Sequence, residues 1–166
     1  MKARPRIRFA SRRDLPGVIA LVRKLAEFEK LAPPEAAALR RYARHGFGRR
    51  RYFRILVAEL DGGLVAYAFF FFAYSTFLGR PTLYLEDLFV LPEARRGGVG
   101  LRLMRELARI ARREGCRRMD WTVLDWNVGA QRFYRRLGAR PLKHWIYYRL
   151  DGTALARMSH QGSTPV

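Results

Sequence analysis

The stretch RRGGVG, residues 95–100, combines residue types that can bind an anion. It stands between LYLEDLFVL, residues 83–91, which has the composition of a strand, and LRLMRELARIARREG, residues 101–115, which has the composition of a helix. A helix N-terminus offers N–H groups without partners and the positive end of the helix dipole, and glycine lets the backbone come close to an anion. The loop is therefore a candidate pyrophosphate cradle, although a tight strand-to-helix connection explains the glycines equally well.

Two common phosphate-binding motifs do not fit this loop. The Rossmann pattern requires a third small residue where Leu103 stands, and the P-loop requires Gly-Lys-Ser/Thr where Gly100 is followed by Leu101 and Arg102. The loop is therefore neither a Rossmann dinucleotide-binding motif nor a P-loop.

Hydrophobic periodicity and turn residues predict the elements that must position this loop. An apolar helix should follow Asp14 as its N-cap and end near Glu29, and Asp61-Gly62-Gly63 should close a hairpin. The other expected helices are 35–44, closed by Gly46 and Gly48, the segment after the glycines, and 128–137. The expected strands are 7–9, 52–60, 64–74, 83–91, 119–124 and 145–150.

The length and composition indicate one globular domain, expected at residues 1–158, with 159–166 as a loose tail. The longest apolar stretch, residues 64–74, is shorter than the roughly 20 residues of a membrane-spanning helix. No segment resembles a signal peptide, so we expect a cytoplasmic protein. Cys116 is the single cysteine and is interpreted as structural, and the three histidines have no metal-ligand spacing, so no metal is expected.

The formal charge of +19 comes from arginine, which supplies 29 of the 33 basic residues. Such a charge could serve a nucleic-acid surface. Because the arginines are spread along the chain and are not gathered in one tract, scattered solvated side chains are the favoured interpretation, and nucleic-acid binding is not expected.

The spacing Arg95-x-x-Gly98-x-Gly100, after a strand and at the start of an amphipathic helix, resembles the acetyl-coenzyme A motif of the GNAT superfamily of N-acetyltransferases. The segments LAEFE (25–29), YSTFLGRPTLYLEDLFV (74–90), VLDWN (123–127) and FY (133–134) look like its spermidine/spermine and thialysine N-acetyltransferase branch. One departure is Ala66-Tyr67, where that branch usually has Gly-Phe after Val. The resemblance implies an α/β fold, with a mixed, mostly antiparallel twisted sheet and helices on both faces.

The resemblance also implies how acetyl-CoA is bound, as a co-substrate between strands 83–91 and 119–124. Backbone amides of the loop would hold the pyrophosphate, with Arg95 as the basic residue of the motif, and the strand backbone would pair with the pantetheine arm. Asn127, which also suits a helix N-cap, and Ala130 would contact coenzyme A. The implied cofactor-binding residues are Leu88, Phe89, Val90, Arg95, Arg96, Gly97, Gly98, Val99, Gly100, Leu101, Asn127, Ala130 and Tyr134.

Acetyl transfer needs a neutral amine, so a group must take a proton from the ammonium, and a carboxylate suits this role. Regular strand alternation predicts that Glu86 and Asp87 point to opposite faces of the sheet. By resemblance Glu86 is the base, acting directly or through water, and Asp87 lines the amine site. An ordinary ion pair with a neighbouring arginine is the competing interpretation of Glu86.

Tyr134 is, by resemblance, the acid that protonates the leaving thiolate, while its spacing to neighbouring apolar residues also suits a packed ring. Phe28 and Glu29 fall where the family has part of the amine site, and a solvated helix end explains them equally well. Ser75 stands where polyamine-type members carry an acid, which favours a lysine-like or thialysine-like amine over long polyamines.

The residues and the resemblance together predict an enzyme that acetylates a primary amine of a small molecule. The resemblance alone implies a homodimer. Acetylation of a peptide or protein amine is the rival within the enzyme class. A non-catalytic, arginine-rich nucleic-acid-binding module on the same fold is the rival outside it.

Overall fold

A computed structural model describes residues 4–160 of the chain. Backbone contacts divide the chain into two units, Met1–Thr122 and Val123–Val166, which are described separately. No helix within the described part has both the length and the apolar character needed to cross a membrane.

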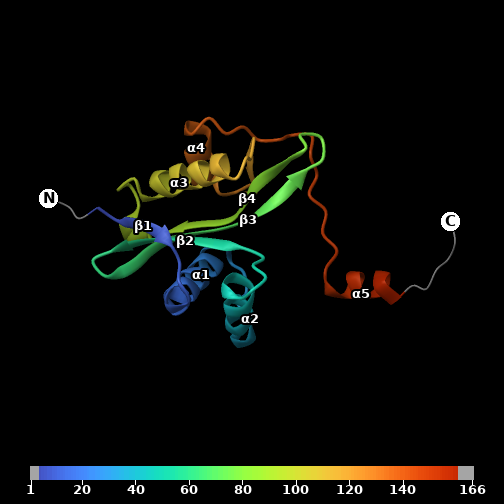
Figure 1. Cartoon of the computed structure of the whole chain (residues 1–166), viewed down its shortest axis with the longest axis horizontal. Coiled ribbons are helices and arrows are strands. Elements are labelled where there is room, and N and C mark those ends of the chain that lie inside the picture. The colour runs from blue at the N-terminus through green and yellow to red at the C-terminus, as the bar shows by residue number, and fades with distance from the viewer. Residues whose placement is uncertain (1–3, 161–166) are drawn as a thin grey trace. The chain divides into compact units, whose positions relative to one another are not determined.

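The first unit is built on a five-stranded sheet with the strand order β1-β2-β3-β4-β5 (Figure 1). The first four strands are antiparallel neighbours, and β4 and β5 are parallel. The predicted mixed, mostly antiparallel sheet is therefore confirmed. The strands are β1 (Arg6–Phe9), β2 (Arg54–Leu60), β3 (Gly63–Ser75), β4 (Arg80–Val90) and β5 (Met119–Trp121).

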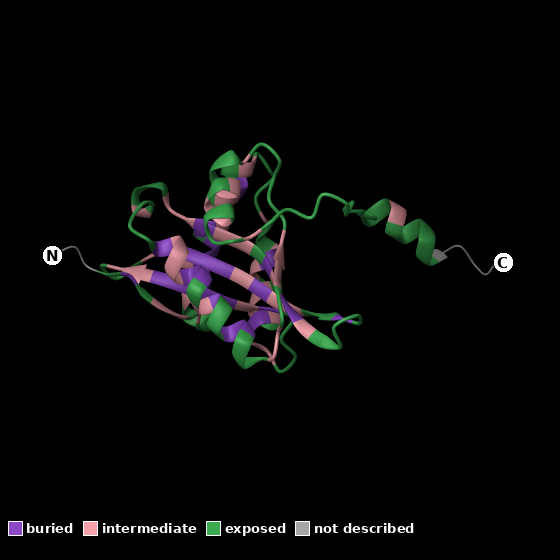
Figure 2. Cartoon of the chain, turned by 90° about the horizontal axis from the view of Figure 1, so that it is seen from above, coloured by how far each residue is buried: buried purple, intermediate pink, exposed green. Residues whose placement is uncertain are grey.

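Helices cover both faces of this sheet, as predicted (Figure 1). On one face α1 (Leu15–Glu29) and α2 (Ala36–Phe47) pack on a core of buried side chains, and α3 (Val99–Arg113) covers the other face. The most deeply buried residues follow the middle of the strands (Figure 2). The core under α1 and α2 consists of Val18, Leu21, Phe53, Ile55, Val57, Tyr67 and Phe89.

Gly46 lies within α2 and does not end it, contrary to the prediction from sequence. A Cβ atom at this position would lie 2.5 Å from Cε2 of Phe53, so the glycine allows the helix to approach the core. Gly48 is the C-cap residue, as predicted.

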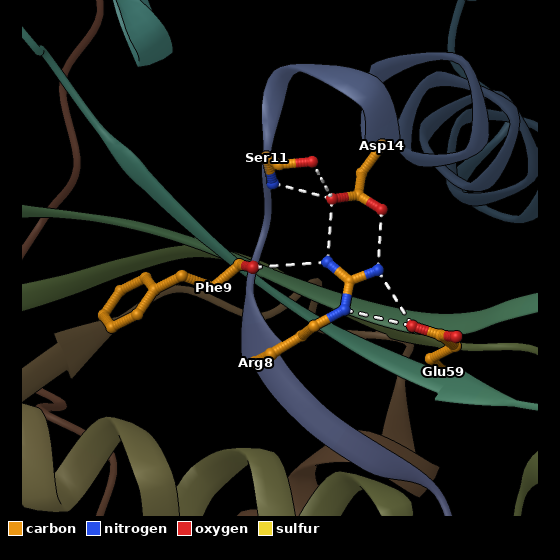
Figure 3. Close-up of polar contacts among 5 residues, drawn as sticks. All are labelled: Arg8, Phe9, Ser11, Asp14 and Glu59. Carbon is orange, nitrogen blue, oxygen red and sulfur yellow. Dashed lines mark hydrogen bonds and ion pairs between the residues drawn. The ribbon is translucent and has the colours of Figure 1, made fainter.

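An ion-pair network ties β1, β2 and the start of α1 together (Figure 3). The Arg8 guanidinium donates two hydrogen bonds of 2.8 Å to the carboxylate of Asp14 and also bonds Glu59 Oε2 at 2.9 Å and 3.0 Å. Asp14 is the N-cap residue of α1, as predicted, but its carboxylate does not cap that helix. It accepts instead from the backbone N–H and the hydroxyl of Ser11, at the start of a short 3-10 turn, η1 (Arg12–Asp14).

The second unit contains α4 (Val128–Arg136) and α5 (Gly152–His160). The expected strand at 145–150 is wrong, because this segment has no regular structure and its apolar side chains are exposed. Helix α5 was not predicted, and it includes Ser159 and His160 of the expected tail, while residues 161–166 lie outside the described part. The single-domain boundary at 158 remains a prediction.

Candidate active site

The sheet opens between β4 and β5 just before the glycine loop. The two strands pair only from Leu83 to Leu85, opposite Met119 to Trp121, and β5 is shorter than the predicted strand 119–124. From Asp87 to Val90, β4 is paired with β3 on one side, and no strand of the described residues pairs with it on the other side. A strand with one unpaired edge can accept an extended ligand in place of a neighbour.

Backbone groups of Leu88 and Val90 point to this open edge. The N–H of Leu91 donates to the carbonyl of Val65 in the β3 direction, and antiparallel pairing alternates, so Phe89 also turns its backbone toward β3. The carbonyl of Val90 accepts a hydrogen bond from Arg95 Nε at 2.9 Å, on the other side. The ring of Phe89 is buried in the core, so this residue supports the strand from within.

The glycine loop leads directly into α3. Gly98 is the N-cap residue with φ 76°, a left-handed conformation that suits glycine. The first backbone bond of the helix runs from the N–H of Arg102 to the carbonyl of Gly98, and no side chain caps the helix. The amides of Val99, Gly100 and Leu101 therefore have no carbonyl partner within the helix and can bind an anion.

Two further loop residues shape the approach to these amides. Arg96 also has a positive φ, 65°, and Gly97 and Arg96 are both exposed. The loop therefore has two residues at positive φ, Arg96 and Gly98, and an exposed backbone directly before the amides at the start of α3.

Arg95 connects the open edge with the end of α1. In addition to its bond to Val90, its guanidinium lies 5.6 Å from the ring centroid of Phe28 and 5.9 Å from that of Phe89. Cation–π contacts at this distance are attractive. They bring Phe28, at the C-terminal end of α1, next to the loop.

A β-bulge in β4 lies at the two acidic residues. Asp87 pairs with Phe69 while Leu85 pairs with Phe70, so Glu86 is an extra residue without a cross-strand partner. Asp87 therefore lies on the side of α1 and α2. The bulge interrupts the regular alternation on which the prediction of opposite faces was based, and the charges of both acids act on Tyr42 of α2. The opposite directions of the two side chains remain a prediction. A bulge gives no signal in a pattern of apolar and polar residues.

Electrostatic interactions connect three carboxylates, because Glu86 and Glu29 both act on Asp87. Burial, followed by the charge of Glu86 and, more weakly, that of Glu29, raises the pKa of Asp87 to about 6. Burial also raises the pKa of Glu29. None of the ion pairs found in residues 4–160 includes any of the three, which argues against the interpretation of Glu86 as a member of an ordinary ion pair.

Asp87 has one hydrogen-bond partner that the sequence analysis did not predict. The hydroxyl of Tyr67, a fully buried residue of β3, donates to Asp87 Oδ2 at 3.2 Å. The sequence feature that could have indicated this bond is Ala66-Tyr67, which stands where the related branch usually has Gly-Phe. Tyrosine in place of phenylalanine adds one hydroxyl group to the core.

Ser75 lies far from these acids. It pairs with Arg80 at the other end of β4, six residues or about 20 Å from Glu86 at the usual rise of a strand. Its side chain is buried, and its Oγ accepts from the N–H of Leu78 at 3.3 Å, in the turn after β3. Its predicted contact with substrate remains a prediction.

The remaining predicted residues belong to the second unit. Asn127 caps α4 through its Oδ1, which accepts from the N–H of Ala130 at 3.1 Å, as its position predicted. Tyr134 is half-buried on the same helix, with its ring 5.3 Å from that of Phe133. The contacts of Asn127 and Ala130 with coenzyme A, and the role of Tyr134 as the acid for the leaving thiolate, remain predictions.

Within the described residues there is no group of three or more His, Cys, Asp or Glu side chains that could hold a metal ion. Burial raises the pKa of the Cys116 thiol, which disfavours the reactive thiolate.

Comparison with known proteins identifies the family of this chain. The model of the acetyltransferase (GNAT) family matches residues 19–139. A thialysine N-epsilon-acetyltransferase of Mus musculus is 36% identical over 168 residues, which cover 95% of this chain and 98% of the mouse protein. The chain therefore belongs to the GNAT family. It is an acetyl-CoA-dependent N-acetyltransferase.

Solved structures show the same fold. An integron cassette protein from the mobile metagenome of V. cholerae has a TM-score of 0.82 at 25% identity, with 94% of this chain and 98% of that chain covered. An aminoglycoside N-acetyltransferase in complex with CoA has a TM-score of 0.75 at 23% identity, with 90% and 97% covered.

Proposed function

We propose that this enzyme acetylates a primary amine of a small, lysine-like or thialysine-like molecule. The observation that supports it is the group of Glu29, Glu86 and Asp87, three carboxylates without an ion-pair partner among the described residues of a chain with a formal charge of +19. An ammonium group would supply the missing positive charge.

The coenzyme is proposed to bind along the open edge of β4 and at the start of α3. The uncapped amides of Val99, Gly100 and Leu101 suit a pyrophosphate, and the outward backbone groups of Leu88 and Val90 suit the amides of a pantetheine arm. When bound, acetyl-CoA supplies an activated acetyl thioester. The exposed loop residues Arg95, Arg96, Gly97 and Gly98 would contact its phosphates.

Glu86 is the proposed proton acceptor, and Asp87 with Glu29 is proposed to hold the substrate ammonium. Because Glu86 is the bulge residue and is exposed, it can pass the proton to water. Asp87 is more deeply buried and can orient the amine next to the open strand edge. Phe28 borders the same region through its contact with Arg95.

Tyr134 is the proposed acid for the leaving thiolate, as the family resemblance implies. Asn127 and Ala130 are proposed to contact coenzyme A from the start of α4. In this role Tyr134→Phe lowers kcat about 10²–10⁴-fold and leaves acetyl-CoA affinity nearly unchanged, because the ring remains.

Long polyamines are expected to be poorer substrates. Ser75 has no charge to hold a second or third ammonium, and the positive potential of the chain slows the encounter with a polycation. The test compares kcat/KM for thialysine, lysine, putrescine, spermidine and spermine at two ionic strengths. A preference for spermine over thialysine at both ionic strengths contradicts the proposed acceptor.

Acetyl-CoA binding has its own test, a thermal-shift titration. Acetyl-CoA should raise the Tm of the wild type, and Gly98→Val should abolish this rise, since a β-branched residue is strained at positive φ. The absence of a response in the wild type contradicts the proposed coenzyme site.

We propose a homodimer as the working form. The segment 142–150 of the second unit has no helix or strand and carries large, exposed apolar side chains. A second copy of the chain could cover them. They are Leu142, Trp145, Ile146, Tyr147, Tyr148 and Leu150, each more than half exposed. Sedimentation equilibrium gives the oligomeric state, and a monomer at micromolar concentration contradicts the proposal. The cytoplasmic location remains a prediction.

A further inference from the structure

The hydroxyl of Tyr67 is a buried polar group at the edge of an apolar core, close to charged and polar side chains. Tyr67 has no exposed surface and belongs to the core cluster with Val57 and Phe89. A buried hydroxyl without a partner is costly, and this one has a single hydrogen bond, to Asp87 Oδ2 at 3.2 Å.

Packing alone does not require this hydroxyl. A phenylalanine ring at the position of Tyr67 would fill the same space between β2 and β4. The hydroxyl therefore adds a bond to Asp87 and no apolar contact.

The surroundings of Asp87 explain what this bond can do. The groups that face it are Glu86 from its own strand, Glu29 from α1, Tyr67 from β3 and Tyr42 from α2. Burial and the two carboxylates disfavour the ionised form of Asp87, and the hydrogen bond from Tyr67 favours it. No lysine or arginine among residues 4–160 forms an ion pair with Asp87, so the phenol takes the place of a cation.

We propose that Tyr67 is a positioning residue that holds the Asp87 carboxylate ionised and oriented for the substrate ammonium. The phenol uses one lone pair of Oδ2 and leaves both lone pairs of Oδ1 available for the amine. Tyr67 thereby sets the lowest pH at which the enzyme binds its amine. The inference rests on the proposed role of Asp87 in amine binding.

The test is the pH dependence of kcat/KM for the best amine in wild type and in Tyr67→Phe. Loss of a hydrogen bond to a charged group should move the acid limb of the profile to higher pH by about one unit, with about a tenfold loss on the acid side and little change above the limb. Tyr42→Phe is the matched control, because it removes a phenol hydroxyl near the same carboxylates but no bond to Asp87. The acid limb of this control should stay in place.

An NMR titration separates this inference from the proposed function, because it needs no turnover. In the wild type the side-chain carboxyl 13C signal of Asp87 should titrate near pH 6, and the 13Cζ signal of Tyr67 should follow the same transition. In Tyr67→Phe the Asp87 transition should move upward. An unmoved acid limb and an unmoved Asp87 transition in a folded Tyr67→Phe, or a Tyr67 signal that ignores Asp87 in the wild type, overturns the inference. An enzyme that acetylates none of the amines but passes the titration overturns only the proposed function.

Discussion

Asp14 and Asp87 are two aspartates in the same unit with opposite electrostatic environments. Asp14 receives two hydrogen bonds from the Arg8 guanidinium, which holds the pKa of its carboxyl well below the usual range (Figure 3). Asp87 receives one bond from the phenol of Tyr67, and burial and two neighbouring carboxylates raise its pKa to about 6. The first is a stabilising ion pair, and the second is an unneutralised acid.

This difference shows that the pKa of a carboxylate depends on its local partners and not on the net charge of the chain. The chain has 29 arginines, yet no ion pair reaches the three acids of the proposed amine site within the described residues. Acids kept without a cation destabilise the fold and remain available to a ligand, as is common at functional sites.

The largest expected contrast is catalytic. Glu86→Gln should lower kcat about 10²–10⁴-fold, since it removes the proposed proton acceptor. Glu59→Gln is the matched control, because Glu59 belongs to the Arg8 network, and its kcat should stay within about twofold of wild type. The comparison would break if both variants lost activity equally while remaining folded.

A second contrast concerns stability at pH 7. Asp14→Asn should lower the free energy of unfolding by about 1–3 kcal/mol, because charge-assisted hydrogen bonds are lost. Asp87→Asn should raise it by about 1–2 kcal/mol, because a disfavoured buried charge is removed and the amide oxygen can still accept from Tyr67. Urea unfolding measures both, and equal signs for the two variants would contradict the assigned environments.

A third contrast is the pH at which each effect disappears. The pKa of Asp14 is lower in the folded than in the unfolded state, so its stabilisation is present above about pH 4 and fades as the pH falls below that value. The pKa of Asp87 is raised, so its cost is present above pH 6 and fades between about pH 6 and pH 4. Urea unfolding of the wild type and both variants at pH 7, 5 and 3 should show the Asp87 difference vanish first. If the Asp14 difference vanished first as the pH falls, the environments assigned to the two aspartates would be wrong.

The smallest expected effect concerns the hydroxyl donors. Ser11 Oγ bonds Asp14 at 2.8 Å, as the Tyr67 hydroxyl bonds Asp87. Ser11→Ala should cost about 0.5–1 kcal/mol of stability and leave the pH profile of kcat/KM unchanged, because Asp14 keeps its arginine. A shift of the acid limb in Ser11→Ala would show that the two aspartates are coupled.

Periodicity and local residue types predicted most of the first unit. The strands β1 to β4, the three long helices and the N-caps Asp14 and Asn127 follow from apolar patterns and turn residues, which act over a few neighbours in the sequence. The glycine loop was found for the same reason, since its spacing is local.

The features that a local pattern could not predict depend on distant pairing. The bulge at Glu86 is defined by the register of β3, and the Tyr67–Asp87 bond joins residues 20 positions apart. The failed strand at 145–150 has strand-forming residues but no paired neighbour in the structure, and propensity alone does not make a strand. The shortness of β5 is likewise a property of its pairing with β4.

The bulge at Glu86 also has a genetic consequence. Phe69 already pairs with Asp87 and Phe70 with Leu85, so a deletion of codon 86 would join two residues whose directions suit a regular ladder. Every other pair between β3 and β4 could be kept. Deletion of Glu86 would therefore keep the pairing register of β3 and β4 on both sides of the bulge. The sheet would be retained, and the enzyme would lose its proposed proton acceptor.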